Sequence, residues 1–258
     1  MKVVILAGGL GTRLSEETVI RPKPMVDIGG KPILWHIMKL YSAQGFHEFI
    51  LCLGYKGYQI KEYFMNYFLH SSDVTVNLQT NEVELHHCAA EPWKVTLVDT
   101  GAETQTGGRL SRIQKYLEDE PFFMTYGDGL SNVRLQDLLR EHRQHANAVA
   151  TMTVVQPLGR FGAVEPDPSG LVHRFHEKPR GDGGWINGGF FVLERSVFEY
   201  IRQDMEPFEG DPLRRLAQRR ALFAYRHDGF WHPMDTLRDK TLLNQLWNAG
   251  QAPWKIWN

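Results

Sequence analysis

The sequence is poor in cysteine: its 258 residues include only Cys52 and Cys88. Two cysteines in a chain of this length do not make a disulfide framework, so we expect a reducing compartment. Long apolar runs are also absent, and the opening residues lack the charged start, apolar middle and small-residue cleavage site of a signal peptide. These absences predict a cytoplasmic protein with no membrane-spanning segment.

The chain also has no excess of positive or of negative charge. The chain has 29 Lys and Arg against 30 Asp and Glu, a net charge of -1, and the two signs are scattered throughout. No basic stripe suggests a nucleic-acid partner, and no acidic run suggests a disordered arm. Because there is also no repeat, low-complexity block or linker, residues 1–258 are predicted to form a single domain with a substantial core.

The first 23 residues organise the rest of the chain. Lys2–Leu6 is a short apolar run rich in β-branched residues, as in the buried first strand of a parallel sheet. The next loop has three glycines within four positions, so its backbone can approach phosphate oxygens and aim several N–H groups at them. Arg13 and Lys23 add cations suited to phosphate. The loop could also be a tight turn with surface charges, because it matches neither standard nucleotide-binding fingerprint.

Strand and helix patterns alternate after this loop. Apolar residues recur at helical spacing in Lys31–Tyr41, Glu48–Leu53 is a second apolar strand, and Ile60–Phe68 is predicted to be a helix. This alternation is typical of the α/β class, and we expect a Rossmann-like, doubly wound mixed sheet with helices on both faces. A β-hairpin insert is predicted at about residues 70–98, where two segments of alternating apolar residues flank a Thr-Asn turn.

Two pairs of histidines could be taken for metal ligands. His86 and His87 are adjacent in a predicted strand, so their side chains point to opposite faces. His142 and His145 lie three apart on a predicted helix, but no third ligand is nearby in the sequence. We therefore interpret the first pair as surface or packing residues and the second pair as part of a solvated helix face.

Two aspartates stand where a parallel sheet places its ligand site. Asp128 follows the apolar segment 121–126 and lies between two glycines, and Asp235 precedes Thr236, which can cap the last long helix. Each aspartate alone could be a turn residue or a helix cap. If both lie at the carboxyl ends of strands, they could hold a divalent metal that bridges phosphate oxygens.

The segments LAGGLGTRL (Leu6–Leu14) and RPKPM (Arg21–Met25) resemble the signature of the sugar-1-phosphate nucleotidyltransferases, which join an NTP to a sugar phosphate and release pyrophosphate. Further motifs of this family agree in order along nearly the whole chain, among them EKP (Glu177–Pro179). The chain is most similar to the glucose-1-phosphate cytidylyltransferases, which share the hairpin insert and the segments TGGRL (Thr106–Leu110), YGDG (Tyr126–Gly129), INGGFFV (Ile186–Val192) and FWHPMDTLRDK (Phe230–Lys240). Thymidylyl relatives commonly carry asparagine in place of Gly129.

The resemblance implies the residues of the site. The catalytic residues would be Arg13, Lys23, Asp128 and Asp235, with Mg²⁺ held by the two aspartates. The nucleotide would bind to Leu6, Ala7, Gly8, Gly9, Leu10, Gly11, Thr12, Arg13, Lys23, Thr104, Gly108 and Arg109. A sugar-binding subregion at about residues 156–235 would contribute Gly162, Glu177, Lys178 and Asn187.

The activity implied by the resemblance is transfer of CMP from CTP to α-D-glucose 1-phosphate, giving pyrophosphate and CDP-glucose, a precursor for deoxysugar and O-antigen biosynthesis. The alternatives are a thymidylyl- or uridylyltransferase and a non-catalytic subunit that binds nucleotide sugars. A dinucleotide-dependent oxidoreductase fits less well, because the glycine spacing is wrong and no acidic ribose ligand follows the second strand. Aromatic residues in the insert and in the tail (Trp247, Trp254 and Trp257) predict a homo-oligomer, although the tail could instead pack on its own core.

Overall fold

A computed structural model describes residues 1–87, 90–157, 163–169, 171–176 and 184–257. At its centre is a seven-stranded mixed sheet in which one strand runs antiparallel to both of its neighbours. In spatial order from one edge to the other, the strands are β14 (Leu222–His227), β10 (Ala150–Val155), β13 (Ile186–Leu193), β8 (Phe122–Tyr126), β1 (Val3–Leu6), β4 (Glu48–Leu53) and β7 (Lys94–Asp99). The reversed strand is β13, which pairs antiparallel with both β10 and β8, whereas the other neighbouring pairs are parallel.

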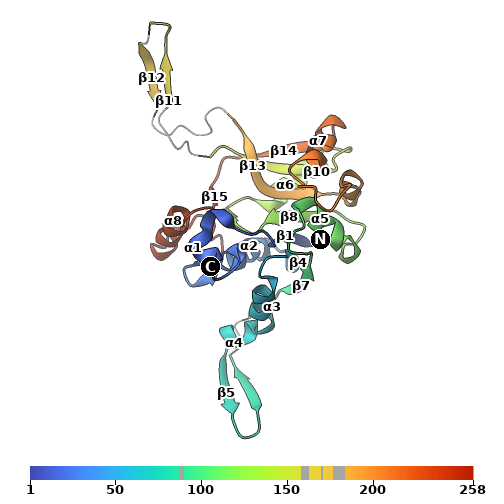
Figure 1. The fold of residues 1–258 in the computed structure, drawn as a ribbon, viewed down its shortest axis with the longest axis vertical. Coiled ribbons are helices and arrows are strands. Elements are labelled where there is room, and N and C mark those ends of the chain that lie inside the picture. Colours follow the sequence, from blue (N-terminus) through green and yellow to red (C-terminus); the bar gives the residue numbers. More distant parts are fainter. Residues whose placement is uncertain (88–89, 158–162, 170, 177–183, 258) are drawn as a thin grey trace.

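Helices cover both faces of this sheet (Figure 1). They are α1 (Ser15–Thr18), α2 (Ile33–Ser42), α3 (Gly57–Met65), α4 (Tyr67–Ser71), α5 (Thr106–Ile113), α6 (Leu135–Arg143), α7 (Asp211–Gln218) and α8 (Leu237–Asn248). Because side chains alternate along a strand, Val3 and Ile5 join the core on the side of α2, α6 and α8, while Val4 and Leu6 join the core under α5 and α7. The predicted fold class is thereby confirmed. None of the helices in the described part of the chain has the length and apolar character needed to cross a bilayer.

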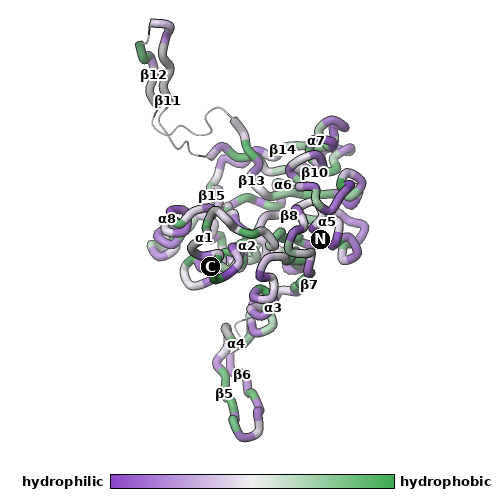
Figure 2. Tube along the Cα trace, in the orientation of Figure 1, coloured by the Kyte–Doolittle hydropathy of each residue, from purple (hydrophilic) through white to green (hydrophobic). Residues whose placement is uncertain are grey.

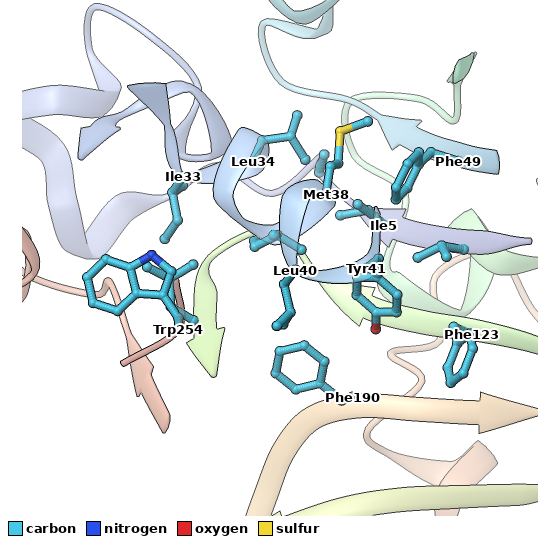
Figure 3. Packing of buried hydrophobic residues seen from close by; sticks show 14 of the residues in the cluster. Ile5, Ile33, Leu34, Met38, Leu40, Tyr41, Phe49, Phe123, Phe190 and Trp254 are labelled. Atoms are coloured by element: carbon cyan, nitrogen blue, oxygen red, sulfur yellow. The ribbon is translucent and has the colours of Figure 1, made fainter. Parts of the chain in front are cut away.

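The C-terminal tail packs on the core beneath α2, where Figure 3 shows the buried Trp254. The indole N–H of Trp254 donates to Nδ1 of His36 at 3.3 Å, and Nε2 of His36 donates to the carbonyl of Ile28 at 2.8 Å. Burial lowers the pKa of His36 to about 4, so the ring is neutral at neutral pH and can accept at one nitrogen while it donates at the other. Trp247 and Trp257 also lie against this ring. The tail therefore packs on its own core. This is the alternative that the sequence left open beside a self-association surface.

Two hairpins extend from opposite ends of the molecule (Figure 1). One consists of β5 (Asp73–Asn77) and β6 (Glu82–His86), which confirms the hairpin predicted within the insert. The other consists of β11 (Ala163–Pro166) and β12 (Val172–His176), in the subregion that the sequence assigns to the sugar.

Several short elements connect the larger ones near the carboxyl edge of the sheet. They comprise the paired strands β2 (Asp27–Ile28) and β3 (Lys31–Pro32), the paired strands β9 (Gly129–Ser131) and β15 (Trp231–Pro233), and the 3₁₀ turns η1 (Thr12–Leu14), η2 (Lys23–Met25), η3 (Gln114–Tyr116) and η5 (Arg195–Tyr200).

One prediction about the histidines is wrong. His142 is buried, not solvated: its Nδ1 lies 2.8 Å from Oγ1 of Thr151, and its Nε2 lies 3.0 Å from a carboxylate oxygen of Glu194. The reason is its position four residues after Leu138, which places it on the apolar face of α6. Within the described ranges, no group of three or more His, Cys, Asp or Glu could hold a metal ion.

Candidate active site

A cavity of about 380 Å³ opens at the carboxyl ends of β1, β7 and β8. This edge is where doubly wound sheets bind ligands, and the volume suits a small molecule. The lining residues come from the loop after β1, the loop after β7, the start of α5, the turn η2 and the end of β8. They are Leu6, Ala7, Gly8, Gly9, Leu10, Gly11, Thr12, Lys23, Pro24, Ala102, Glu103, Thr104, Gln105, Thr106, Arg109, Tyr126, Gly127 and Asp128.

The glycine-rich loop after β1 forms one wall of the cavity. Among the described residues, no backbone carbonyl accepts a hydrogen bond from the N–H groups of Gly9, Leu10 or Gly11. Gly11 has a φ of +66°, and a Cβ there would lie only 2.7 Å from Cγ2 of Thr18, so this position requires glycine. A loop with several such N–H groups is suited to binding an anion. Arg13 lies in η1, but its side chain is outside the described part of the structure.

Lys23 joins the two predicted metal-binding aspartates. Its ammonium nitrogen lies 2.7 Å from a carboxylate oxygen of Asp128 and 2.7 Å from one of Asp235. The Lys23 side chain is only 9% exposed, whereas the two carboxylates remain partly open to solvent. Burial disfavours the charged ammonium, but the attraction of both carboxylates outweighs it and holds the pKa of Lys23 above its ordinary value. Lys23 is therefore a cation in this site at neutral pH.

Two aspartates that are far apart in the sequence meet because β9 and β15 pair. Gly129 lies opposite Pro233 in this antiparallel ladder, and the N–H of Met234 donates to the carbonyl of Asp128 at 2.8 Å. The residues that flank the ladder, Asp128 and Asp235, are thus both brought within hydrogen-bond distance of the Lys23 ammonium. This convergence was predicted from the sequence.

Asp239 holds the backbone around Asp235. One of its carboxylate oxygens accepts from the N–H groups of Asp235 at 3.1 Å and Thr236 at 2.8 Å, while Oγ1 of Thr236 accepts from the N–H of Asp239. This reciprocal pair is the predicted capping box of α8. His232 contacts the other carboxylate oxygen of Asp239 at 3.1 Å. The strand β15 and the helix cap together fix the direction of Asp235.

The donor set of this site suits a hard divalent cation. Mg²⁺ is usually bound in proteins by one or two carboxylates together with phosphate oxygens and water. Asp128 and Asp235 are two carboxylates that both contact the ammonium of Lys23, and Lys23 and Asp128 line a cavity with a loop suited to phosphate. The carboxylates present therefore fit a magnesium ion.

A smaller cavity of about 50 Å³ lies beside Asp128, between the ends of β8, β13 and β15. Asn187 and Tyr126 line it, and the amide nitrogen of Asn187 donates to the Tyr126 hydroxyl at 3.4 Å. Burial and the nearby Glu209 hold the pKa of Tyr126 well above its ordinary value, so the hydroxyl stays protonated. Trp231 lines the same cavity, and its indole N–H donates to the carbonyl of Gly188 at 2.6 Å. The other predicted sugar-site residues, Gly162, Glu177 and Lys178, lie outside the described residues.

Apart from Arg13, whose side chain is not described, the structure gathers the predicted nucleotide residues around the larger cavity with one exception. Gly108 does not line it: a Cβ there would lie 2.2 Å from the carbonyl oxygen of Asp204, so this glycine allows α5 to pack closely against that segment. Our sequence reasoning missed Gln105, Thr106 and Tyr126. Tyr126 could have been found as the last residue of an apolar strand, and residues 102–106 because they follow the carboxyl end of another strand.

Comparisons with known proteins agree with this geometry. A family model described as "Nucleotidyl transferase" matches residues 2–236. The chain is 58% identical over 258 residues to a glucose-1-phosphate cytidylyltransferase of Salmonella typhi, and 47% identical over 258 residues to a probable glucose-1-phosphate cytidylyltransferase of Bacillus subtilis; both matches cover 100% of each chain. A crystal structure of HddC from Yersinia pseudotuberculosis, complexed with GMP-PN, superposes with a TM-score of 0.68 at 26% identity, covering 95% of this chain and 99% of that one.

Proposed function

The chain belongs to the nucleotidyl transferase family, and we propose that within it the chain transfers CMP from CTP to α-D-glucose 1-phosphate, giving CDP-glucose and pyrophosphate. The observation that carries this proposal is the meeting of Lys23, Asp128 and Asp235 beside the glycine-rich loop. A nucleotide-sugar sensor without turnover would not need two carboxylates directed at the place where a triphosphate would bind.

The reaction is an in-line displacement at the α-phosphorus of CTP. A phosphate oxygen of glucose 1-phosphate attacks, and the bond to the pyrophosphate oxygen breaks. Because the attacking oxygen is already anionic, the protein does not need to generate a nucleophile; it must align the two substrates and neutralise crowded negative charge. This requirement matches a cavity whose walls supply backbone N–H groups and a buried ammonium.

The predicted phosphate-binding and metal-binding residues each have a role in this reaction. The N–H groups of residues 8–12 hold the triphosphate, and Arg13 binds the β- and γ-phosphates and the departing pyrophosphate. Lys23 lies between phosphates of both substrates. Asp128 and Asp235 would hold Mg²⁺, which when bound would neutralise phosphate charge and polarise the phosphoryl oxygens.

The glucose phosphate occupies the side of the smaller cavity in our proposal. Asn187 has both a donor and an acceptor with which to bind sugar hydroxyls. Glu177 would accept hydrogen bonds from further hydroxyls, Lys178 would bind the sugar's phosphate, and Gly162 would let the ring approach the backbone. The support for these last three roles is their family motif in the sequence.

A panel of nucleotides tests the proposed activity directly. Pyrophosphate release is measured with glucose 1-phosphate and each of CTP, UTP, dTTP, ATP and GTP at equal concentration, with Mg²⁺. We expect CTP to be preferred by at least about tenfold in kcat/KM, a difference of roughly 1.4 kcal/mol in transition-state binding.

Other outcomes of the panel point to the alternatives. A preference for dTTP or UTP would indicate a thymidylyl- or uridylyltransferase. The absence of turnover with every nucleotide, together with calorimetric binding of CDP-glucose, would favour a non-catalytic subunit. The role of CDP-glucose in deoxysugar and O-antigen biosynthesis and a cytoplasmic location stay predictions.

The hairpin of β5 and β6 supports our proposal that the chain forms a homo-oligomer. Val74 pairs with Leu85 and Val76 with Val83, so these four side chains share one face, and all four are exposed. Figure 2 shows the apolar residues along this projecting arm. A two-stranded hairpin is marginally stable alone in water, and an apolar face of this kind is stabilised when a second copy of the chain covers it.

Sedimentation equilibrium checks this proposal. We expect the wild type to have a mass that is a multiple of the 29.7 kDa chain, and the double variant Val76→Lys, Val83→Lys to shift toward the single chain. The control is Thr75→Lys, on the opposite, polar face of the hairpin, which should leave the mass unchanged. A wild type that sediments as a single chain would contradict the proposal.

A further inference from the structure

Arg109, in the first turn of α5, connects three loops at the carboxyl edge of the sheet. Its Nη2 donates to the carbonyl of Gly8 at 2.9 Å and to that of Ala102 at 3.2 Å. Its Nη1 donates to the carbonyl of Leu53 at 3.0 Å and to that of Gly101 at 2.8 Å. These acceptors follow or end β1, β4 and β7, so one planar group joins three neighbouring parallel strands where the nucleotide cavity opens.

The guanidinium is directed at the protein although Arg109 borders the cavity. Only 4% of the residue is exposed, and Nη1 also donates to Oγ1 of Thr100 at 2.9 Å. Each terminal nitrogen has two N–H groups, and with these five bonds both nitrogens are supplied with acceptors from the chain itself. All of these acceptors are neutral oxygens. Such an arrangement positions the loops and leaves the phosphates of a ligand to other groups.

When Arg109 holds a backbone carbonyl, it also determines the direction of the N–H group of the following residue. In a trans peptide the C=O and the following N–H point in opposite directions. Since the carbonyl of Gly8 is turned toward Arg109, the N–H of Gly9 points away from the guanidinium; Ala102 fixes the N–H of Glu103 in the same way. Gly8–Thr12 and Ala102–Thr106 are the two loop walls of the cavity, so a single side chain orients backbone groups in both.

The close fit around the guanidinium depends on glycine. A Cβ on Gly8 would lie 2.2 Å from Nη1 of Arg109, and a Cβ on Gly54 would lie 2.4 Å from the same atom and 2.6 Å from the carbonyl oxygen of Gly8. Gly54 does not line the cavity. Because a methyl group at Gly54 would clash with both the guanidinium and the Gly8 carbonyl that it holds, it would disturb this contact without touching the ligand or removing the charge.

We propose that Arg109 is a positioning residue that sets the spacing and the N–H directions of the two walls that bind CTP. This inference rests on the proposed function, because it assumes that the larger cavity is the nucleotide site. Arg109 acts through Gly8, Gly101 and Ala102, and a different cation at this position cannot replace it. An ammonium lacks the planar fork that reaches both walls at once.

Steady-state kinetics of Arg109→Ala and Arg109→Lys test the proposal. We expect kcat/KM for CTP to fall about 100-fold in both variants, as for other small misplacements of binding groups, with a raised KM for CTP and a KM for glucose 1-phosphate within about threefold of wild type. Guanidinium ion at millimolar concentration should restore part of the activity of Arg109→Ala, because it can enter the space left beside the cavity. A merely destabilised enzyme would instead lose active fraction, lowering kcat for both substrates with unchanged KM values.

Two further variants keep the test independent of whether Arg109→Ala folds. Gly54→Ala should reproduce the CTP-specific defect while Arg109 is still present. Arg112→Ala is the matched control from the next turn of α5; Arg112 donates to the Thr100 carbonyl and to Asp204 but does not line the cavity, so CTP kinetics should stay near wild type.

Near wild-type CTP kinetics in Arg109→Lys, or in both Arg109→Ala and Gly54→Ala, would overturn the positioning role while wild-type turnover of CTP upholds the proposed function. A wild-type enzyme that neither turns over nor binds CTP would contradict both.

Discussion

Replacing Lys23 with methionine is expected to lower kcat/KM for CTP by about 10²–10³-fold, the range found when one preorganised charge-stabilising group is removed from an active site. Methionine keeps most of the buried stem but removes the ammonium that lies 2.7 Å from both Asp128 and Asp235. The two carboxylates would then face each other without a cation in the free enzyme. Initial-rate measurements of pyrophosphate release over a CTP titration give the effect.

A second measurement separates this electrostatic role from a loss of packing. Because the carboxylates of Lys23→Met lack their ammonium, Mg²⁺ should raise the melting temperature of the variant more than that of the wild type. Lys39→Met is a matched control, since Lys39 also pairs with a carboxylate, that of Glu91 at 2.6 Å, but lies on α2 away from the cavity. Wild-type kinetics in Lys23→Met would remove Lys23 from the catalytic residues.

The variants Asp128→Asn and Asp235→Asn should each reduce kcat/KM by about 10³-fold at low Mg²⁺, equivalent to roughly 4 kcal/mol of transition-state stabilisation. Asparagine preserves the shape of the side chain but removes the charge that a divalent cation requires. The midpoint of the Mg²⁺ dependence should therefore rise at least about tenfold in either variant. Rates are measured over a Mg²⁺ titration at fixed CTP.

The double variant gives information that the single ones do not. If both aspartates hold the same ion, their effects should be far from additive, because the second substitution removes a ligand from a site that is already impaired. Asp137→Asn on α6 is the control; Asp137 pairs with Arg140 on the surface, where such pairs contribute little to stability. An unchanged Mg²⁺ midpoint in both single variants would show that the metal is bound elsewhere.

Local patterns in the sequence were enough to predict the main elements of the fold. Glu48–Leu53 forms β4 with the bounds predicted. An apolar run this short, flanked by polar and glycine residues, is too short for a helix and therefore indicates a strand. The predicted helix at residues 60–68 is two helices, α3 and α4, which meet at Asn66; there the backbone, with a φ of -104° and a ψ of 13°, leaves the helical region. The helical spacing of apolar residues continues across this break, so the sequence pattern could not reveal that the helix is divided.

The sequence by itself determined the chemistry that is available: a glycine-rich loop after a strand, cations near it and aspartates after later strands. Only the tertiary structure decided where these groups meet, because Lys23 lies 105 residues from Asp128 and 212 from Asp235, and the pairing of β9 with β15 brings them together. It also turned the guanidinium of Arg109 toward three loops of the chain and buried His142. The physical reason is that strand and helix propensities depend on neighbouring residues, whereas side-chain partners depend on packing between segments that the sequence leaves far apart.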